Sequence, residues 1–322
     1  MADNEVQTAS APGEACRNCG APLSARYCGV CGQRALDPDE RRFGHLLRDA
    51  FGVLTNLDGR AWRTFIALLF RPGQLSRDYI AGRRIFWLSP IAVFLLANLL
   101  FFLSPPISDF TLQFEDQVTG EVILMANEGQ TVSPQLEALL RDWRGPVYSP
   151  LTSGLVKGRV EARDAAARAE NPPTGSYSVS SYRDAYNAVS SETGKLLIGL
   201  HIPFMALALA ALFPARRLLF TDHFVAALHM FSFFIIAQQL LMLPLRIASG
   251  LTDASWVSAG FSYLVLTGLL VFAAYMVIAI RAIYAAAWWR TALSSVALLA
   301  ALLATHLLIY RPVQFLVIHA LI

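Results

Sequence analysis

Charge is scarce in this sequence, and cysteine is confined to its first part. Only 15% of the 322 residues are charged and 55% are hydrophobic, whereas a water-soluble domain carries about 25% charged residues. An ordinary soluble globular protein is therefore excluded. The first 30 residues contain no apolar run preceded by basic residues, so we expect no secretory signal peptide. Residues 1–15 are polar and are predicted to be disordered.

Catalytic signatures are also missing. The sequence contains no H-E-x-x-H, no G-x-S-x-G and no pair of carboxylates inside its apolar runs. The long polar segment at residues 104–194 has no such signature either. These absences count against the common hydrolase and metalloprotease mechanisms.

Five apolar runs dominate what is present. They cover residues 85–103, 196–213, 224–245, 257–280 and 291–309. Each run is long enough to cross a hydrocarbon core of ~30 Å at a helical rise of ~1.5 Å per residue. Buried helices of a soluble protein are the alternative, and five runs without a central charge argue against it. The sequence therefore predicts an all-α polytopic membrane protein with about five transmembrane helices, four of them within residues 195–322.

Arginine is distributed unevenly around these runs. Twelve of the 26 Lys and Arg residues lie in the first 84 positions, and all twelve are Arg. The arginines beside the runs are Arg71, Arg77, Arg83 and Arg84 before the first, Arg216 and Arg217 before the third, and Arg281 and Arg290 between the fourth and the fifth. Because basic residues favour the cytoplasmic side, we expect a cytoplasmic N-terminus and an extracytoplasmic C-terminus in the cell's inner (plasma) membrane.

The segment at residues 104–194 is then predicted to be an extracytoplasmic loop domain of mixed structure. Residues 111–126 alternate around a Thr-Gly turn and predict a β-hairpin. Residues 134–143 predict a short helix and residues 170–181 a loop. Residues 181–191 predict an amphipathic helix that leads into the second run.

Residues 40–84 are neither soluble core nor membrane span. Apolar side chains recur at helical spacing in residues 41–54 and again in residues 59–70, with arginine and tryptophan at the edges. This composition is typical of amphipathic helices that lie in the membrane interface and contact anionic lipid. A small soluble helical hairpin packed on the cysteines is the alternative.

All four cysteines lie in two C-x-x-C-G motifs within residues 16–34. The motifs are formed by Cys16, Cys19, Cys28 and Cys31. Four thiolates suit tetrahedral zinc, and glycine after each pair suits the left-handed turn of a zinc knuckle. Because no ligand position is left for water, the zinc would be structural. A redox disulfide and an iron–sulfur cluster are the alternatives, and a reducing cytoplasm and the lack of a βαβ pattern disfavour the first.

A resemblance follows from longer stretches. LLFRPGQLSRDYIAGRR (residues 68–84), IPFMALALAALF (residues 202–213) and RRLLFTDHFVAALHMFSF (residues 216–233) resemble a family of bacterial membrane proteins known only as a domain of unknown function. Asp222 stands where that family would lead us to expect glutamate. The resemblance implies the membrane topology and an N-terminal zinc ribbon. It implies no activity.

Five ionisable residues lie within or beside the predicted spans, where such groups are costly and often functional. They are His201, Asp222, His223, His229 and His306. Asp222 and His229 share a helix face because they are seven residues apart. These side chains form either hydrogen bonds between helices, a proton or substrate path, or an intramembrane active site. Asp222 is also placed to cap its helix.

Three functions follow from these observations. The first is a non-enzymatic inner-membrane protein whose zinc ribbon and basic helices dock a cytoplasmic protein partner or membrane lipids. The second is a component of a transporter or permease. The third is an intramembrane enzyme acting on a lipid-linked substrate, with Asp222 and His229 as the acid–base pair. Nucleic acid is not an expected partner, and the odd number of runs is compatible with a homo-oligomer.

Overall fold

The computed structural model describes residues 15–23, 27–35, 59–103, 110, 112–128, 133–169, 176–214, 218–251 and 255–322. These residues form helices, turns and two isolated antiparallel bridges. The chain divides into two compact units. Unit 1 comprises Met1–Ser104 and Ile202–Ala301, and unit 2 comprises Pro105–His201 and Leu302–Ile322.

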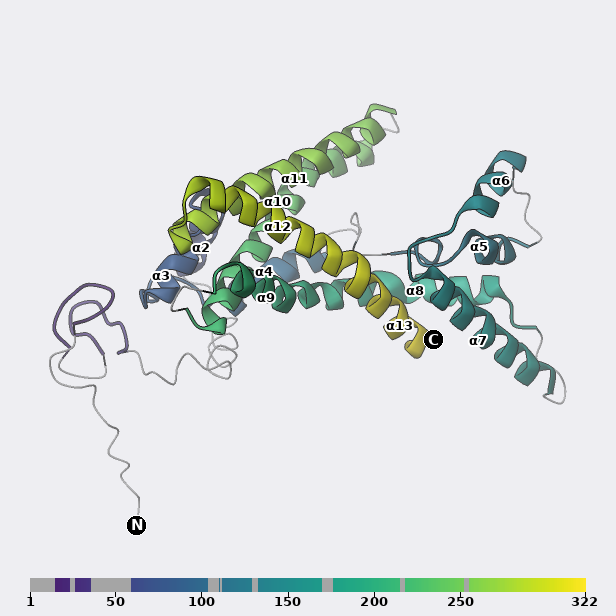
Figure 1. Cartoon of the computed structure of the whole chain (residues 1–322), viewed down its shortest axis with the longest axis horizontal. Helices are drawn as coiled ribbons and strands as arrows, with labels where there is room; N and C mark the ends of the chain where they lie inside the picture. Colours follow the sequence, from purple (N-terminus) through teal and green to yellow (C-terminus); the bar gives the residue numbers. More distant parts are fainter. Residues whose placement is uncertain are drawn as a thin grey trace, which may run out of the picture. The chain divides into compact units, whose positions relative to one another are not determined.

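Unit 1 is a bundle of apolar helices with two short helices packed on it (Figure 1). Its helices are α2 (Gly59–Phe70), α3 (Gln74–Ile80), α4 (Pro90–Leu103), α9 (His201–Leu212), α10 (Phe220–Leu251), α11 (Ser255–Tyr284) and most of α12 (Trp288–Thr305). Helix α10 packs against α3, α4 and α11. Ala92 and Ala97 of α4 and Ala226 of α10 are fully buried. Such small side chains let apolar helices approach closely in a membrane.

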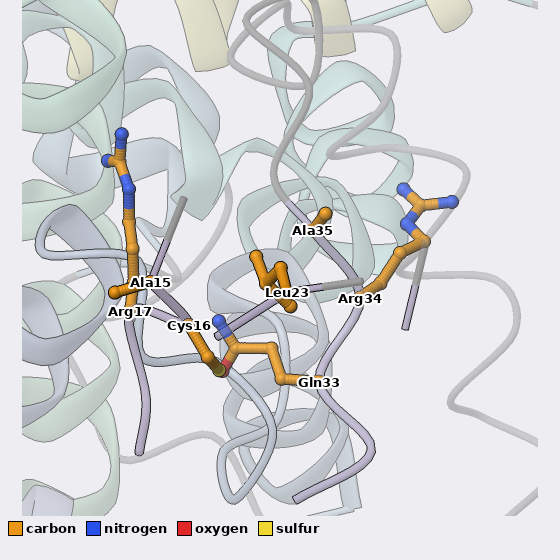
Figure 2. Close-up of a pocket in the computed structure, with 7 residues that line it drawn as sticks. All are labelled: Ala15, Cys16, Arg17, Leu23, Gln33, Arg34 and Ala35. Carbon is orange, nitrogen blue, oxygen red and sulfur yellow. The ribbon is translucent and has the colours of Figure 1, made fainter. Parts of the chain in front are cut away.

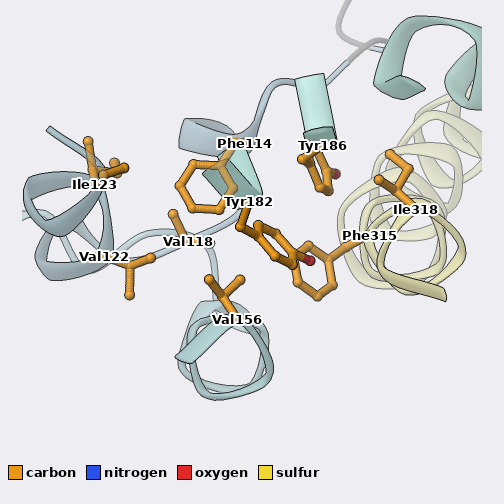
Figure 3. Close-up of a cluster of buried hydrophobic side chains, with 10 residues drawn as sticks. Phe114, Val118, Val122, Ile123, Val156, Tyr182, Tyr186, Phe315 and Ile318 are labelled. Atoms are coloured by element: carbon orange, nitrogen blue, oxygen red, sulfur yellow. The ribbon is translucent and has the colours of Figure 1, made fainter. Parts of the chain in front are cut away.

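Unit 2 is helical as well. Its elements are η2 (Phe114–Asp116), α5 (Gly120–Ala126), α6 (Pro134–Asp142), α7 (Ser149–Ala169), α8 (Val179–Leu197), η3 (Ile198–Leu200), the end of α12, the π-helix η4 (His306–Tyr310) and α13 (Arg311–Leu321). Figure 3 shows how side chains from separate elements meet in its core, including Phe114, Tyr182, Tyr186 and Phe315. Helix α13 packs against α8, so residues far apart in the sequence close the same core.

Four helical segments of the described chain are long and apolar enough to cross a membrane. They are Val179–Leu212, Phe220–Pro244, Leu266–Tyr284 and Trp288–Leu321. Each overlaps one of the last four predicted runs, although the described segment for the run at residues 257–280 begins only at Leu266. The first predicted run is confirmed only as a shorter apolar helix, because α4 has 14 residues and spans about 21 Å. Turns occupy residues 85–87 ahead of it.

Two of the spanning candidates are longer than a membrane requires. Val179–Leu212 and Trp288–Leu321 have 34 residues each, or about 51 Å at the rise of an α-helix. Each crosses from one unit to the other, at His201/Ile202 and at Ala301/Leu302. The predicted extracytoplasmic loop is therefore part of a larger unit, which also takes in the C-terminal helix.

The predicted β-hairpin at residues 111–126 is wrong. The described part of this stretch forms η2 and α5. Thr119-Gly120 is the start of α5, with Thr119 as the N-cap, and no turn lies between strands there. The buried residues Val122, Ile123 and Ala126 follow helical spacing, which the alternation of the preceding residues obscured. The short helix at 134–143 and the amphipathic helix at 181–191 are confirmed by α6 and α8.

Several predictions fall outside the described residues. They concern the disordered start at residues 1–14, the first interfacial helix at residues 41–54, and the positions of Arg216 and Arg217. The second interfacial helix is described and corresponds to α2.

Candidate metal centre and its contacts

The two C-x-x-C-G motifs fold into two similar knuckles. In the first, the N–H of Gly20 donates to the C=O of Cys16 at 2.7 Å, and in the second Gly32 donates to Cys28 at 2.8 Å. Gly20 and Gly32 have φ of +77° and +72°, a conformation that side chains with a Cβ disfavour. Antiparallel bridges between Ala15 and Pro22 and between Tyr27 and Arg34 close the knuckles. The repeated motif therefore produces a repeated turn.

The four sulfur atoms converge on one point. Cys16 Sγ lies 3.6 Å from Cys31 Sγ, and Cys19 Sγ lies 3.6 Å from Cys28 Sγ. All four lie within 4.8 Å of one another, and all four cysteines are free thiols. Tetrahedral Zn–S bonds of ~2.3 Å place neighbouring sulfurs about 3.8 Å apart, whereas a disulfide requires ~2.05 Å. The arrangement can therefore hold a metal ion.

Backbone N–H groups favour the thiolate form of two of these ligands. The N–H groups of Cys31 and Val30 lower the pKa of the Cys28 thiol. The N–H of Gln33 lowers the pKa of Cys31 to about 6. Metals bind the thiolate and not the thiol, so these hydrogen bonds favour the metal-binding form of Cys28 and Cys31, whereas desolvation and the three neighbouring thiols raise the pKa of Cys19. Four cysteine ligands also fill a tetrahedral shell and leave no position for a substrate.

A cavity beside the knuckles is too small for an organic ligand. Figure 2 shows the residues that line it, which are Ala15, Cys16, Arg17, Leu23, Gln33, Arg34 and Ala35. Its volume of about 10 Å³ accommodates about one water molecule. The cysteine module therefore offers a metal site at this place and not a pocket for a metabolite.

Gln33 connects the module to the loop at residues 82–85, which lies between α3 and α4. Its Nε2 donates to the C=O of Gly82 at 2.6 Å, and its Oε1 accepts from the N–H of Arg84 at 3.3 Å. The Gln33 side chain is buried, with 7% exposed. Next to it, a Cβ added to Gly32 would lie 3.7 Å from Ile85 Cδ1, so the second knuckle rests directly on this loop.

The 82–85 loop is in turn fastened to α3. Arg83 forms an ion pair with Asp78 at 2.5 Å, and its N–H donates to the C=O of Asp78 at 2.8 Å. The guanidinium of Arg84 lies 4.0 Å from the centre of the Tyr79 ring. Asp78 is buried, so this ion pair offsets part of the cost of burying its carboxylate.

Helix α3 fits tightly against α10 and α11. Gly73, directly before α3, has φ of +79°, and a Cβ there would lie 2.7 Å from the C=O oxygen of Ala279. No larger residue can occupy this position without moving the backbone. Farther along α3, Ser76 Oγ and His229 Nδ1 are hydrogen-bonded at 2.9 Å, and both side chains are buried.

The predicted ionisable residues of α10 have separate partners. Asp222 Oδ2 accepts from the N–H of Leu219 at 3.0 Å, which places it as a cap at the helix start. His223 Nδ1 is hydrogen-bonded to the hydroxyl of Tyr284 at 2.8 Å. Asp222 therefore caps α10 itself, whereas His223 joins α10 to α11 and His229 joins it to α3.

The two other predicted histidines meet in unit 2. His201 Nδ1 donates to the C=O of Ile198 at 3.0 Å, and its Nε2 lies 3.3 Å from His306 Nδ1. The Phe110 ring packs edge-on against both imidazoles. Sequence reasoning did not predict the hydrogen-bond partners of these ionisable residues. Ser76, Tyr284 and Gln33 are ordinary polar residues whose roles appear only when distant segments are brought together.

The comparison with protein families gives one match. Residues 58–102 match the family described as Protein of unknown function (DUF3667). The matched region spans α2, α3 and α4 and includes the 82–85 loop, while the four cysteines lie before it. The expected resemblance to an uncharacterised family is thus confirmed for this region. Comparisons with curated proteins and with solved structures give no match.

Proposed function

We propose that this chain is a non-enzymatic protein of the inner (plasma) membrane of a bacterial cell. Its N-terminal module would bind one structural zinc ion at the cytoplasmic face, and its helix α2 would dock there on anionic lipid headgroups. The observation that carries this proposal is the two-sided character of α2, which combines a face packed in unit 1 with an exposed aromatic face.

The packed face of α2 is held by the bundle. Thr64, Ala67 and Leu68 are buried, and the Thr64 hydroxyl accepts from the N–H of Leu88 at 3.1 Å. This hydrogen bond ties α2 to the residues just before α4. The helix therefore cannot turn its opposite face inward.

The opposite face exposes large apolar side chains. Trp62 is 72% exposed and Phe70 is 76% exposed, with Ile66 between them at the same spacing of four residues. Arg63 and Arg71 are exposed beside this face. A soluble helix would place polar residues here, whereas Trp and Arg beside apolar residues are characteristic of the membrane interface. Each basic residue near anionic lipid contributes about 1 kcal/mol to binding.

Zinc is the metal that best explains the cysteine module. In the described part of the module, the buried cluster consists of Cys16, Leu23 and Cys28, with Ala21, Cys31 and Ala35 partly buried against it, which is too little apolar burial to fold a chain. Metal binding supplies the missing free energy in modules of this kind. A closed set of four thiolates in a reducing cytoplasm favours a structural zinc ion.

Contacts in unit 1 support the proposed orientation. The ring of Tyr284, at the end of α11, stacks on Phe213 with 4.1 Å between ring centres, and His223 at the start of α10 stacks on it as well. The ends of α9 and α11 and the start of α10 therefore meet. Arg281 and Arg290 lie at this same end, which the positive-inside rule assigns to the cytoplasm.

Reporter fusions test the orientation. Activity reporters fused after Arg217 and after Ile322 should read the cytoplasmic and the extracytoplasmic side, respectively, if α4 and the four longer helices all cross the membrane. Equal readings at the two positions would show that one of the three spanning candidates between them does not cross.

Fluorescence quenching tests the docking of α2. The protein is reconstituted in nanodiscs whose lipids carry bromine on the acyl chain near the headgroup. The signal lost on Trp62→Phe should be quenched by brominated lipid and shielded from aqueous iodide. Trp143→Phe, on unit 2, is the matched control and should remove an iodide-sensitive signal. Iodide quenching of Trp62 without quenching by brominated lipid would contradict lipid docking and would point to a protein partner.

The transporter and the intramembrane enzyme remain the alternative functions. Both require the buried ionisable groups to exchange protons or to meet a substrate. The different partners of Asp222 and His229 favour separate hydrogen bonds over a joint acid–base pair. A loss of biological function on His229→Gln, with normal membrane insertion, would reverse this preference.

A further inference from the structure

We propose that the cysteine module is a metal-dependent clamp on the 82–85 loop, so that metal occupancy fixes the segment leading into α4. This inference rests on the proposed metal binding and adds a target for it within the same chain. The 82–85 loop lies in the region that matches the family, at residues 58–102, and the cysteine module lies outside it.

Gln33 is the joint between the metal site and the loop. Its backbone N–H is hydrogen-bonded to the sulfur of Cys31, and its C=O accepts from the N–H of Cys28 at 2.8 Å. Two metal ligands therefore fix the backbone of Gln33. Its side chain, held by this backbone, points away from the metal site to the loop.

The side-chain amide of Gln33 pairs with the backbone of the loop in the way that a neighbouring β-strand would, with one donor and one acceptor. One carboxamide donates to the C=O of Gly82 and accepts from the N–H of Arg84. Both loop groups need partners because unpaired buried backbone groups are costly. Glutamate would lose the donor and alanine would lose both bonds. Because the side chain is buried, solvent competes little for these bonds.

The position of the loop also affects α3, because side chains of the loop contact residues of that helix. Displacing the loop would separate Arg83 from the buried carboxylate of Asp78 and Arg84 from the Tyr79 ring. Both partners belong to α3, which is bonded to α10 through Ser76 and His229. A continuous set of contacts thus runs from the cysteines to a spanning helix.

Without a metal the clamp has no means of staying folded. Among its described residues, the buried apolar cluster is Cys16, Leu23 and Cys28, with Ala21, Cys31 and Ala35 partly buried against it. In such small modules the folding free energy comes from the metal. Loss of the ion would release the Gln33 backbone and with it both hydrogen bonds to the loop.

Hydrogen–deuterium exchange of the full-length protein in nanodiscs tests the clamp. Exchange is followed in the peptide covering residues 81–89, before and after a zinc chelator, with metal content measured in each sample. Chelation should speed the exchange of the Arg84 amide about fivefold or more, the factor expected for one lost hydrogen bond. Gln33→Ala should do the same while zinc stays bound.

Two further variants complete the design. Gln33→Glu keeps the acceptor for Arg84 and should give a smaller effect than Gln33→Ala. Val30→Ala changes an exposed side chain of the same knuckle and should leave both metal content and exchange unchanged.

The two possible failures are distinguishable. If the purified protein contains no metal and takes up none when metal is added, the proposed metal binding is refuted. A protein that binds metal but whose loop exchanges at the same rate with and without it, or in Gln33→Ala, would overturn the clamp alone.

Discussion

The cysteine module and unit 2 hold their folds together in different ways. Among its described residues, the module's buried apolar cluster consists of Leu23 and two of its own cysteines, Cys16 and Cys28, whereas unit 2 buries a cluster of ten side chains, among them Phe114, Tyr182, Tyr186 and Phe315. Under the proposed metal binding, we expect the first to depend on a metal ion and the second on packing. Loss of the metal should therefore unfold one and leave the other intact, and loss of packing should do the reverse.

The largest effect is expected when a metal ligand is removed. Cys28→Ser should abolish metal binding and with it the free energy of roughly 10–16 kcal/mol that structural zinc supplies to such modules. Amide exchange should rise throughout residues 15–35 and remain unchanged in residues 112–128. A variant that retains its metal and its protection would show that Cys28 is not a ligand.

A packing change in unit 2 should produce the opposite pattern. Phe114 is fully buried, and Phe114→Ala should lower the free energy of unfolding of unit 2 by about 3–5 kcal/mol. The loss is measured by heating the protein and following the unfolding of unit 2 through its cleavage by a protease. The metal content should stay constant. A loss below about 1 kcal/mol would mean that the core around Phe114 is looser than described.

The seat of α3 in unit 1 should respond to a single methyl group. Gly73→Ala places a Cβ 2.7 Å from the Ala279 oxygen at a positive φ, a strain of about 1–3 kcal/mol. A lower midpoint of thermal unfolding in detergent is the expected result. Gly154→Ala, where the added Cβ meets nothing within 4 Å, is the matched control and should not lower it.

An effect of similar size is expected at the hydrogen bond between α3 and α10. His229→Leu leaves the buried Ser76 hydroxyl without this partner, at a cost of about 1–3 kcal/mol, while His229→Gln keeps a hydrogen-bonding group and should cost less. The double variant with Ser76→Ala should recover part of the loss. If Ser76→Ala gave no recovery, the described bond would not be what His229 contributes.

Local spacing made part of this structure predictable. The two C-x-x-C-G motifs define the metal site because ligands and turn lie within a few residues of one another. The last four apolar runs overlap the spanning candidates because length and composition decide that property. Helix α2 emerged from the periodicity of residues 59–70.

Long-range pairing could not be predicted in this way. The bond between Ser76 and His229 joins residues 153 positions apart, and neither neighbourhood indicates the other. Helix α7 was missed because its few buried residues, such as Thr152 and Val156, form a weak apolar stripe. The continuation of α8 into α9 agrees with the predicted amphipathic helix at residues 181–191 that leads into the second run, because the two form one segment, Val179–Leu212.

X-ray absorption at the zinc edge tests the central claim most directly. The full-length protein, purified in detergent without added metal, should contain about one zinc ion per chain with four sulfur neighbours at ~2.3 Å. Cys28→Ser should lose that signal. A protein without zinc, or with zinc bound to nitrogen and oxygen atoms in place of sulfur, would contradict the account.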